Sequence, residues 1–354
     1  MPTERTPPGQ QVFGLLGATG IAARAVVEPA ARTGAARVRA VAAGDPVRAR
    51  AFAAEHGVPV VHETYADLLA DPEITAVYVS LHNSAHAWWA AQAARSGRHV
   101  LVEKPACLSL RELHGIRRAA EAGGVRVAEA LMTTGVPALA RVADLVADFD
   151  GPLGELIGIH THITFTAPTG YRRLPELGGG ILLDAAPYWL QAVQVATQPI
   201  DSGRVPAGPI AVEVKSEGPD GADEACEAAF EPVPGVQATL SCGFGERHAA
   251  GHEFVFARGH ARLRGFLRPA AAALPLNLSV VTGGGRHVEA FAPVHYYDAQ
   301  LLRIARSFAV PPGGGSGHDR GSGHVVDEIG LTRRTSLLEE LQRAAYEALL
   351  GGTA

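Results

Sequence analysis

The sequence predicts an α/β protein with two domains: an N-terminal doubly wound parallel sheet, and a C-terminal α+β domain with an open, mostly antiparallel sheet. In the first third of the chain, short apolar runs alternate with helical patterns, which is typical of a parallel sheet covered by helices on both faces. Later, several strand-like runs follow one another without helices between them, which is typical of an antiparallel sheet. The length of 354 residues suffices for two such domains.

The first domain contains five apolar runs that we expect to be parallel strands, over residues 11–16, 38–42, 76–79, 99–102 and 125–128. Alanine-rich stretches with helical spacing predict helices over residues 46–56, 64–70, 85–96 and 110–122. Glycine or proline at positions such as Gly57, Gly97 and Gly124 marks the joints between these elements. We place the domain boundary near Glu129, which gives a flexible tail 1–10, a first domain 11–128 and a second domain 129–354.

The second domain begins with an alternating pattern that predicts a strand over residues 154–164 and a helix over 181–197. Six further strand-like runs follow, at residues 210–216, 224–230, 236–244, 252–257, 261–266 and 277–281. Helical patterns return at 297–308 and 327–350, on either side of a glycine-rich loop, and these C-terminal helices could pack back on the first domain.

Composition excludes several classes of protein. A net charge of -5 argues against nucleic acid as the main partner. No run of 18 apolar residues occurs, so no membrane span is expected, and the polar, proline-rich N-terminus does not resemble a signal peptide. Three cysteines without a C-x-x-C pair indicate a reducing compartment, which we take to be the cytoplasm. His160 and His162 lack carboxylates at ligand spacing, so we expect no metal site.

A glycine-containing turn, GLLGATGIA, follows the first strand and opens a helical stretch. Unobstructed backbone amides at such a helix start can bind the pyrophosphate of a dinucleotide, although an ordinary strand–helix turn would show the same pattern. The residues expected to contact the dinucleotide are Gly17, Thr19, Gly20 and Ile21. Thr19 replaces the usual middle glycine, and its hydroxyl could contact a phosphate.

Asp45 follows the second strand, where an acidic residue can bind the adenosine ribose and favour NAD. Alternatively, Asp45 caps the helix that begins at Pro46, because proline is typical of a first helical position. Arg48 or Arg50 could bind a 2′-phosphate, so both NAD and NADP stay open as cofactors.

Polar residues gather at the carboxyl ends of two further strands, where open α/β sheets bind ligands. The segments are SLHNSAH at 80–86 and EKP at 103–105. Lys104 is one of only two lysines among 31 cationic residues, which suggests that arginine cannot replace it. An ammonium beside a reacting oxygen stabilises the charge that develops there during hydride transfer. The alternative is a lysine that merely ends a strand.

The order of these motifs resembles the glucose-fructose oxidoreductase / inositol dehydrogenase (Gfo/Idh/MocA) family, from about residue 11 through the C-terminal helices. This resemblance implies a Rossmann domain that binds NAD or NADP. It implies that Lys104 hydrogen-bonds the reacting hydroxyl or carbonyl, next to a peptide bond that is often cis before Pro105. Gly44, where NADP-preferring relatives often have arginine, favours NAD. Further cofactor contacts are implied for Leu81, Asn83, His86 and Glu103.

A second motif, GGGILLDAAPY at 178–188, resembles the family's tyrosine subgroup, which includes dihydrodiol dehydrogenases and nucleotide-sugar 3-ketoreductases. A spacing of four places Asp184 and Tyr188 on one helix face. The resemblance implies that Tyr188 is the general acid/base and that Asp184 orients the substrate. It also places Arg172 near the substrate, although a surface arginine and a packed tyrosine are the simpler interpretations.

These features predict an NAD(P)-dependent oxidoreductase that interconverts a secondary alcohol and a ketone on a sugar-like or cyclitol substrate. The first candidate activity is that of a nucleotide-linked keto-sugar reductase of secondary metabolism, and the second is that of a dihydrodiol or aldose dehydrogenase. The segment 133–136 and Ala186 depart from the family pattern, which leaves a catalytically inactive dinucleotide-binding sensor as the alternative class. The open sheet predicts a homodimer or homotetramer.

Overall fold

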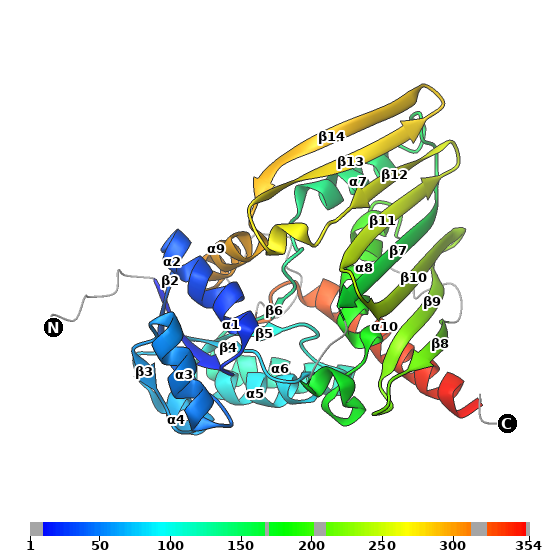
Figure 1. The fold of residues 1–354 in the computed structure, drawn as a ribbon. Helices are drawn as coiled ribbons and strands as arrows, with labels where there is room; N and C mark the ends of the chain where they lie inside the picture. The colour runs from blue at the N-terminus through cyan, green and yellow to red at the C-terminus, as the bar shows by residue number, and fades with distance from the viewer. Residues whose placement is uncertain (1–9, 167–169, 202–209, 313–323, 352–354) are drawn as a thin grey trace. The chain divides into compact units, whose positions relative to one another are not determined.

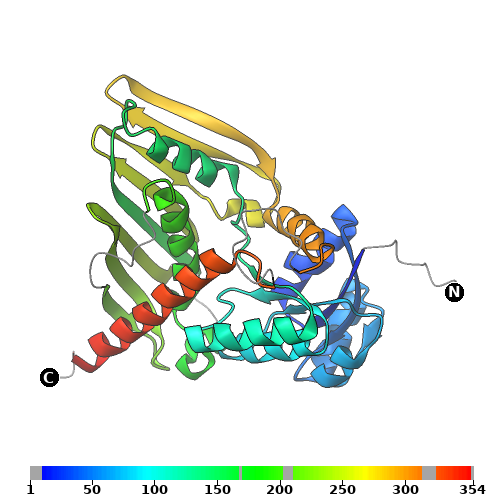
Figure 2. The same ribbon diagram turned by 180° about the vertical axis from the view of Figure 1, so that it is seen from behind.

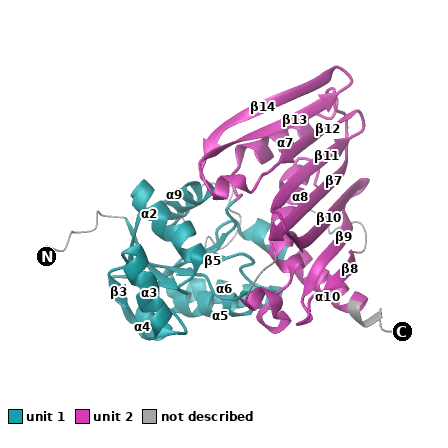
Figure 3. Cartoon of the chain, viewed as in Figure 1, with its two compact units in different colours: residues 1–132, 296–335 teal, residues 133–295, 336–354 magenta. Residues whose placement is uncertain are grey.

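The computed structural model describes residues 10–166, 170–201, 210–312 and 324–351. Most of the predicted N-terminal tail and residues 313–323 of the glycine-rich loop lie outside these ranges. The chain divides into two compact units (Figure 3). Unit 1 comprises residues 1–132 and 296–335, and unit 2 comprises residues 133–295 and 336–354. The segment 296–335, assigned from sequence to the second domain, is therefore part of unit 1.

Unit 1 contains a six-stranded parallel sheet in the order β3-β2-β1-β4-β5-β6 (Figure 1). This order confirms the predicted doubly wound sheet, with a switch point between β1 and β4, where such sheets bind ligands at their carboxyl edge. The two-residue strand β3 was not predicted because it is too short to show a pattern. The strands are β1 (Gln11–Leu16), β2 (Ala36–Ala42), β3 (Val60–Val61), β4 (Ala76–Val79), β5 (His99–Glu103) and β6 (Val127–Ala130).

Helices flank this sheet. The first is a continuous helical run made of α1 (Gly20–Ala22), a π-helical turn (Ala23–Val27) and α2 (Glu28–Thr33). The others are α3 (Pro46–His56), α4 (Tyr65–Ala70), α5 (Asn83–Arg95), α6 (Leu110–Gly123), α9 (Tyr296–Phe308) and the start of α10 (Glu328–Gly351). The side chains of Asp45, Thr64 and Ser109 cap α3, α4 and α6 by accepting hydrogen bonds from backbone amides.

Unit 2 is built on an eight-stranded sheet in the order β14-β13-β12-β11-β7-β10-β9-β8. Every neighbouring pair is antiparallel except β7 and β10, so the sheet is mixed but mostly antiparallel, as predicted. The strands are β7 (Leu156–Thr166), β8 (Ala211–Glu217), β9 (Asp223–Val233), β10 (Val236–Gly245), β11 (Ala249–Phe256), β12 (Gly259–Arg264), β13 (Leu274–Thr282) and β14 (Gly285–Val294).

Two helices, α7 (Pro137–Ala147) and α8 (Ile181–Thr197), pack against each other and against this sheet (Figures 1 and 2). Alternate residues of β10 are buried because one face of the sheet is covered. Neither α7 nor β14 was predicted from the sequence. Strand β14 is mostly exposed and lacks a clear apolar alternation. No helix in the described residues is long and apolar enough to cross a membrane.

A buried histidine joins α5 to the loop that follows β5. The His86 ring is only 1% exposed, and its Nδ1 lies 2.8 Å from the carbonyl oxygen of Pro105. Its Nε2 lies 3.1 Å from the carbonyl oxygen of Leu81. Burial lowers the pKa of His86 to about 4, although the two carbonyls favour the charged ring. The imidazole is therefore neutral at pH 7. Its single N–H fits best on Nδ1, which makes the shorter contact, with Pro105.

Substitutions at two glycines of α6 can test how closely α5 packs against α6. A Cβ at Gly123 would lie 1.9 Å from the carbonyl oxygen of Ala94, whereas a Cβ at Gly115 would meet nothing within 4 Å. We expect Gly123→Ala to lower the free energy of unfolding by about 1–3 kcal/mol. Gly115→Ala, the matched control, should raise it by about 0.5–1 kcal/mol. Urea unfolding measures both, and equal effects of the two substitutions would contradict the packing.

The burial of His86 predicts a pH-dependent stability. The unfolded residue binds a proton below its ordinary pKa of about 6.5, whereas the folded ring stays neutral down to about pH 4. The free energy of unfolding therefore falls as the pH is lowered through this window. His86 should account for a decrease of about 2 kcal/mol in that free energy between pH 7 and pH 5. His86→Gln should remove that part of the pH dependence in urea unfolding, and His114→Gln, at an exposed position of α6, should not.

Candidate functional site

The glycine turn after β1 is shaped for close approach of a ligand. Gly17 has φ of 114°, and a Cβ there would lie 2.8 Å from the backbone oxygen of Ser80, so only glycine fits. Gly20 is exposed, and a Cβ there would meet nothing within 4 Å. Ile21 is half-buried in the first helical turn. The turn thus presents open backbone at the start of a 14-residue helical run from Gly20 to Thr33, which fits a dinucleotide pyrophosphate.

Thr19 performs a structural role in this turn. Its hydroxyl accepts a hydrogen bond from the amide of Ala22 at 3.1 Å and donates to Ser80 Oγ at 2.9 Å. The hydroxyl is therefore engaged within the protein, so a phosphate contact by the side chain would have to replace one of these bonds. The backbone amide is the better candidate for a contact with the cofactor.

The geometry of Asp45, after β2, is compatible with both of its predicted roles, as a helix cap and as a ligand of the ribose. Its carboxylate caps α3 by accepting from the amide of Val47 at 2.8 Å, as the cap hypothesis predicted. The side chain is exposed, so its second oxygen remains available to a ribose hydroxyl. Arg48 Nη2 lies 3.5 Å from the carbonyl oxygen of Ala18 in the glycine turn, whereas Arg50 pairs with Glu63 at 2.9 Å.

The segment after β4 carries three residues for which cofactor contacts were expected. Leu81 is half-buried against the hydrophobic core, and Asn83 is the half-buried first residue of α5. His86, also expected to contact the cofactor, has a buried ring, and both of its nitrogens face backbone carbonyls. We assign His86 to holding the loop after β5.

Lys104 lies in that loop, at the carboxyl edge of the sheet, and is half-buried. The peptide bond between Lys104 and Pro105 is cis, as the family resemblance implied. Glu103, at the end of β5, accepts hydrogen bonds from the Tyr78 hydroxyl and, at 3.2 Å, from the amide of Lys104. The carboxylate of Glu103 therefore fixes the backbone next to the lysine, in addition to any contact with a cofactor.

In unit 2, the N-terminus of helix α8 is held by a carboxylate from the sheet. Gly180 has φ of 112°, and a Cβ there would lie 2.0 Å from Asp223 Oδ1. Asp223, on β9, accepts a hydrogen bond from the amide of Leu182 at 2.7 Å, and burial raises the pKa of this carboxyl. Asp223 thereby satisfies an amide of the first turn of the helix that carries the predicted catalytic side chains.

The structure brings Arg172 and Asp184 together. Arg172 Nε lies 3.2 Å from Asp184 Oδ2, and the arginine side chain is 44% exposed whereas the carboxylate is 15% exposed. Tyr188 lies one helical turn beyond Asp184, is 7% exposed, and packs edge-to-face on Phe266 with ring centroids 6.3 Å apart. The three predicted residues thus lie at one end of α8, where the short 3₁₀ turn Gly170–Arg173 reaches the helix.

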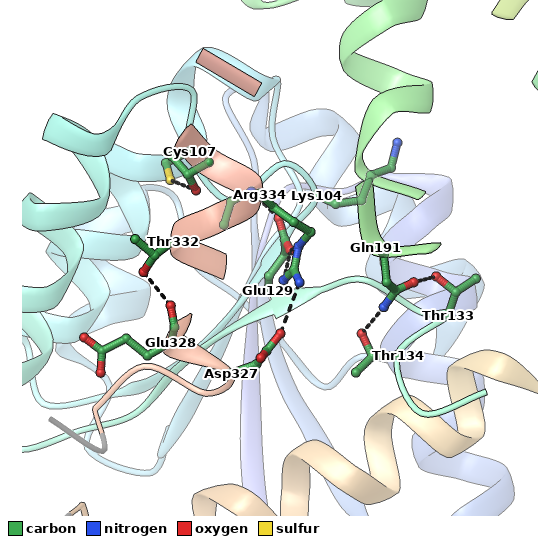
Figure 4. Close-up of polar contacts among 12 residues, drawn as sticks. Lys104, Cys107, Glu129, Thr133, Thr134, Gln191, Asp327, Glu328, Thr332 and Arg334 are labelled. Atoms are coloured by element: carbon green, nitrogen blue, oxygen red, sulfur yellow. Dashed lines mark hydrogen bonds and ion pairs between the residues drawn. The ribbon is translucent and has the colours of Figure 1, made fainter. Parts of the chain in front are cut away.

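Gln191, which sequence analysis did not single out, lies three residues after Tyr188 on α8. It accepts a hydrogen bond from Thr133 and donates one to Thr134 Oγ1 at 2.8 Å (Figure 4). Its spacing of seven from Asp184 was the available signal, because i and i+7 lie on the same helix face. The segment that departs from the family pattern is therefore held by α8, the helix of Tyr188.

Within the described ranges, no group of three His, Cys, Asp or Glu side chains could hold a metal ion. His160 Nδ1 instead lies 2.7 Å from Thr239 Oγ1, and His162 Nε2 lies 3.0 Å from Thr164 Oγ1.

Curated relatives of the chain act on sugars and related diols. The chain is 36% identical over 187 residues to a D-xylose 1-dehydrogenase (NADP(+)) of Haloferax volcanii, covering 52% of this chain and 56% of the relative. It is 36% identical over 182 residues to a dTDP-3,4-didehydro-2,6-dideoxy-alpha-D-glucose 3-reductase of Streptomyces antibioticus, covering 51% and 55%. The matched region thus spans little more than half of each of these relatives.

Solved structures share the complete fold. A 3-ketoreductase from Actinomadura kijaniata, crystallised with TDP-benzene and NADP, superimposes with a TM-score of 0.79 at 22% identity, covering 95% of this chain and 98% of the other. An aldose-aldose oxidoreductase from Caulobacter crescentus gives a TM-score of 0.75 at 20% identity, covering 96% and 98%.

Family models match both parts of the chain. Residues 12–131 match a model described as an oxidoreductase family with an NAD-binding Rossmann fold. Residues 139–262 match the GFO/IDH/MocA C-terminal domain. The predicted resemblance is therefore confirmed: the chain belongs to the Gfo/Idh/MocA family of oxidoreductases, and residues 12–131 form its NAD-binding domain.

Proposed function

We propose that this protein is an NAD(P)-dependent oxidoreductase that interconverts a secondary alcohol and a ketone on a sugar-like substrate. The observation that carries the proposal is the position of Lys104. It lies on a hydrogen-bonded loop at the carboxyl edge of the NAD-binding sheet, where open α/β sheets bind ligands. Such a lysine can polarise the substrate oxygen beside a bound nicotinamide.

A nicotinamide dinucleotide supplies the hydride chemistry when it is bound. The exposed backbone at Gly20 would hold its pyrophosphate, after the tight turn at the buried Gly17, whose amide donates to the carbonyl oxygen of Ala42 at 2.9 Å, and Asp45 would hold its adenosine ribose. Gly44 offers no cation to a 2′-phosphate, so we propose that NAD is preferred, although the xylose dehydrogenase relative uses NADP.

The chain's own residues have distinct roles in this proposal. Lys104 donates a hydrogen bond to the reacting oxygen and stabilises its alkoxide character. Tyr188 exchanges the proton with that oxygen, because a phenol can act as a general acid/base. Asp184, already paired with Arg172, orients the neighbouring hydroxyl groups of the sugar.

The substrate proposed first is a nucleotide-linked keto-sugar, supported by the dTDP-sugar 3-reductase relatives. One of these, from Streptomyces violaceoruber, is 27% identical and aligns with 94% of this chain. A free aldose is the second candidate, supported by the xylose dehydrogenase. Consumption or formation of reduced cofactor should be followed with dTDP-3,4-didehydro-2,6-dideoxy-alpha-D-glucose, D-xylose and trans-1,2-dihydrobenzene-1,2-diol. A protein that binds cofactor but turns over none of them would instead be a sensor.

We also propose a cytoplasmic homodimer or homotetramer formed through the uncovered face of the eight-stranded sheet. Ile157 on β7 and Val288 on β14 are each 45% exposed, which is consistent with a surface that pairs with a second copy. Light scattering of the purified protein distinguishes these states from a monomer.

Lys104→Met removes the ammonium, and we expect kcat to fall about 10²–10³-fold because the developing oxyanion loses its donor. The affinity for cofactor, measured by fluorescence titration, should change little. The control is Lys215→Met, which removes the other lysine of the chain, 41% exposed on β8, and should leave kcat unchanged. Equal activity of the two variants would show that Lys104 is not catalytic.

Tyr188→Phe tests the proton-exchange role. The substitution keeps the ring that packs on Phe266 and removes only the hydroxyl, so we expect a loss of about 10²–10⁴-fold in kcat without loss of folding. Tyr346→Phe, at a 63% exposed tyrosine of α10, is the matched control. Full activity of Tyr188→Phe in steady-state assays would move the acid/base role to another group.

Gly44→Arg tests cofactor preference. The new guanidinium would lie next to the capped start of α3 and could pair with a 2′-phosphate, so the ratio of kcat/KM for NADP to that for NAD should rise about tenfold or more. The ratio is measured by steady-state kinetics with both cofactors. An unchanged ratio would mean that the ribose binds away from this turn.

A further inference from the structure

The backbone around Lys104 is held by side chains from several elements of unit 1. As described above, Glu103 binds the amide of Lys104, and His86 binds the carbonyl of Pro105. The next peptide is held as well, because the amide of Ala106 donates to Glu129 Oε1 at 3.1 Å. Three consecutive residues thus have a backbone group fixed by a different side chain.

Glu129, on β6, is in turn held by an arginine of α10. Arg334 Nη2 donates to Glu129 Oε2 at 2.9 Å, and Arg334 Nη1 donates to Asp327 Oδ2 at 3.1 Å (Figure 4). The side chains of Arg334 and Glu129 are only 8% and 6% exposed. Each oxygen of the Glu129 carboxylate therefore has its own partner, one on the lysine loop and one on α10.

A buried ion pair is a poor source of stability, because desolvation offsets most of the attraction between the charges. A well-packed apolar pair could fill the same space. What an apolar pair cannot provide is an acceptor for the Ala106 amide, which would otherwise be buried without a partner. The pair is therefore better explained by the peptide that it holds than by the stability that it adds.

We propose that Glu129 and Arg334 are positioning residues for Lys104. Arg334 orients the Glu129 carboxylate, and that carboxylate fixes the Ala106 peptide, two residues after the lysine, so that the ammonium extends from a rigid backbone. This inference rests on the proposed function, because it assumes that Lys104 serves the reaction. Mispositioning of a catalytic group by about 1 Å can cost about 10²-fold in rate.

Glu129→Leu removes the acceptor, Glu129→Gln keeps an oxygen for Ala106, and Arg334→Lys keeps the charge but loses the planar fork that binds two carboxylates. The matched control is Glu328→Leu. Glu328 pairs with Arg117 at 3.0 Å, with side chains 14% and 18% exposed, at the start of the same helix and away from the lysine loop. Thermal unfolding of all four variants shows how much stability each substitution removes.

Hydrogen–deuterium exchange of the peptide covering residues 103–108 reports the loop directly. We expect faster exchange at Ala106 in Glu129→Leu, a smaller increase in Arg334→Lys, and none in Glu328→Leu. Should Glu129→Leu fail to fold, Arg334→Lys and Glu129→Gln carry the test. Unchanged exchange in every folded variant at Glu129 and Arg334 would overturn the proposal.

Kinetics with the substrate found in the panel, beginning with D-xylose, reports the consequence for Lys104. We expect Glu129→Leu to lose about 10–100-fold in kcat, with little change in cofactor KM and a larger deuterium isotope effect from cofactor labelled at the nicotinamide C4. A defect in stability alone would lower the active fraction and leave the isotope effect unchanged, and that result would contradict the proposal. If the wild-type protein turns over no probe, the proposed function fails, and exchange at Ala106 still decides whether Glu129 and Arg334 fix the loop.

Discussion

The hydrogen bonds that fix the backbone from Lys104 to Ala106 are the constraint on which the proposed chemistry depends. A lysine has a long, flexible side chain, so the position of its ammonium is only as well defined as the peptide that carries it. Here that peptide is bound by His86 and Glu129, which are buried and come from different elements of unit 1. Reliable placement of a charge near a reacting oxygen requires such support, because preorganised charges need no rearrangement during the reaction.

Within unit 2, helix α8 is held in a similar way, because a buried carboxylate binds its backbone. Asp223 satisfies an amide at the start of α8, and only glycine at position 180 leaves room for that carboxylate. The same helix then presents Asp184, Tyr188 and Gln191 along one face. Gln191 also binds Thr133 and Thr134, so residues that depart from the family pattern are tied to the helix with the proposed proton donor.

Much of the fold could be predicted from the sequence, because apolar runs with clear periodicity and glycine or proline joints define most strands and helices of unit 1. The short strand β3 and the exposed strand β14 were missed, since neither shows a strong apolar pattern of its own. Helix α7 was overlooked although its buried residues Leu139, Val142 and Val146 recur at helical spacing. Lys104 and Asp184 could be singled out as candidates because their motifs are local. Arg334 was not, because its role depends on the folding of α10 against β6, across about two hundred residues of sequence, and no local pattern reports such a contact.

The family and its NAD-binding domain are established, whereas substrate and catalytic roles are proposals that join Lys104 of unit 1 with Tyr188 of unit 2. The most direct measurement is a crystal structure of the protein with a bound nicotinamide cofactor and a sugar alcohol. The account predicts that Lys104 Nζ and Tyr188 Oη both lie within hydrogen-bond distance, about 3 Å, of the oxygen on the reacting carbon. A complex in which that oxygen is bound by other side chains, with either residue out of reach, would contradict it.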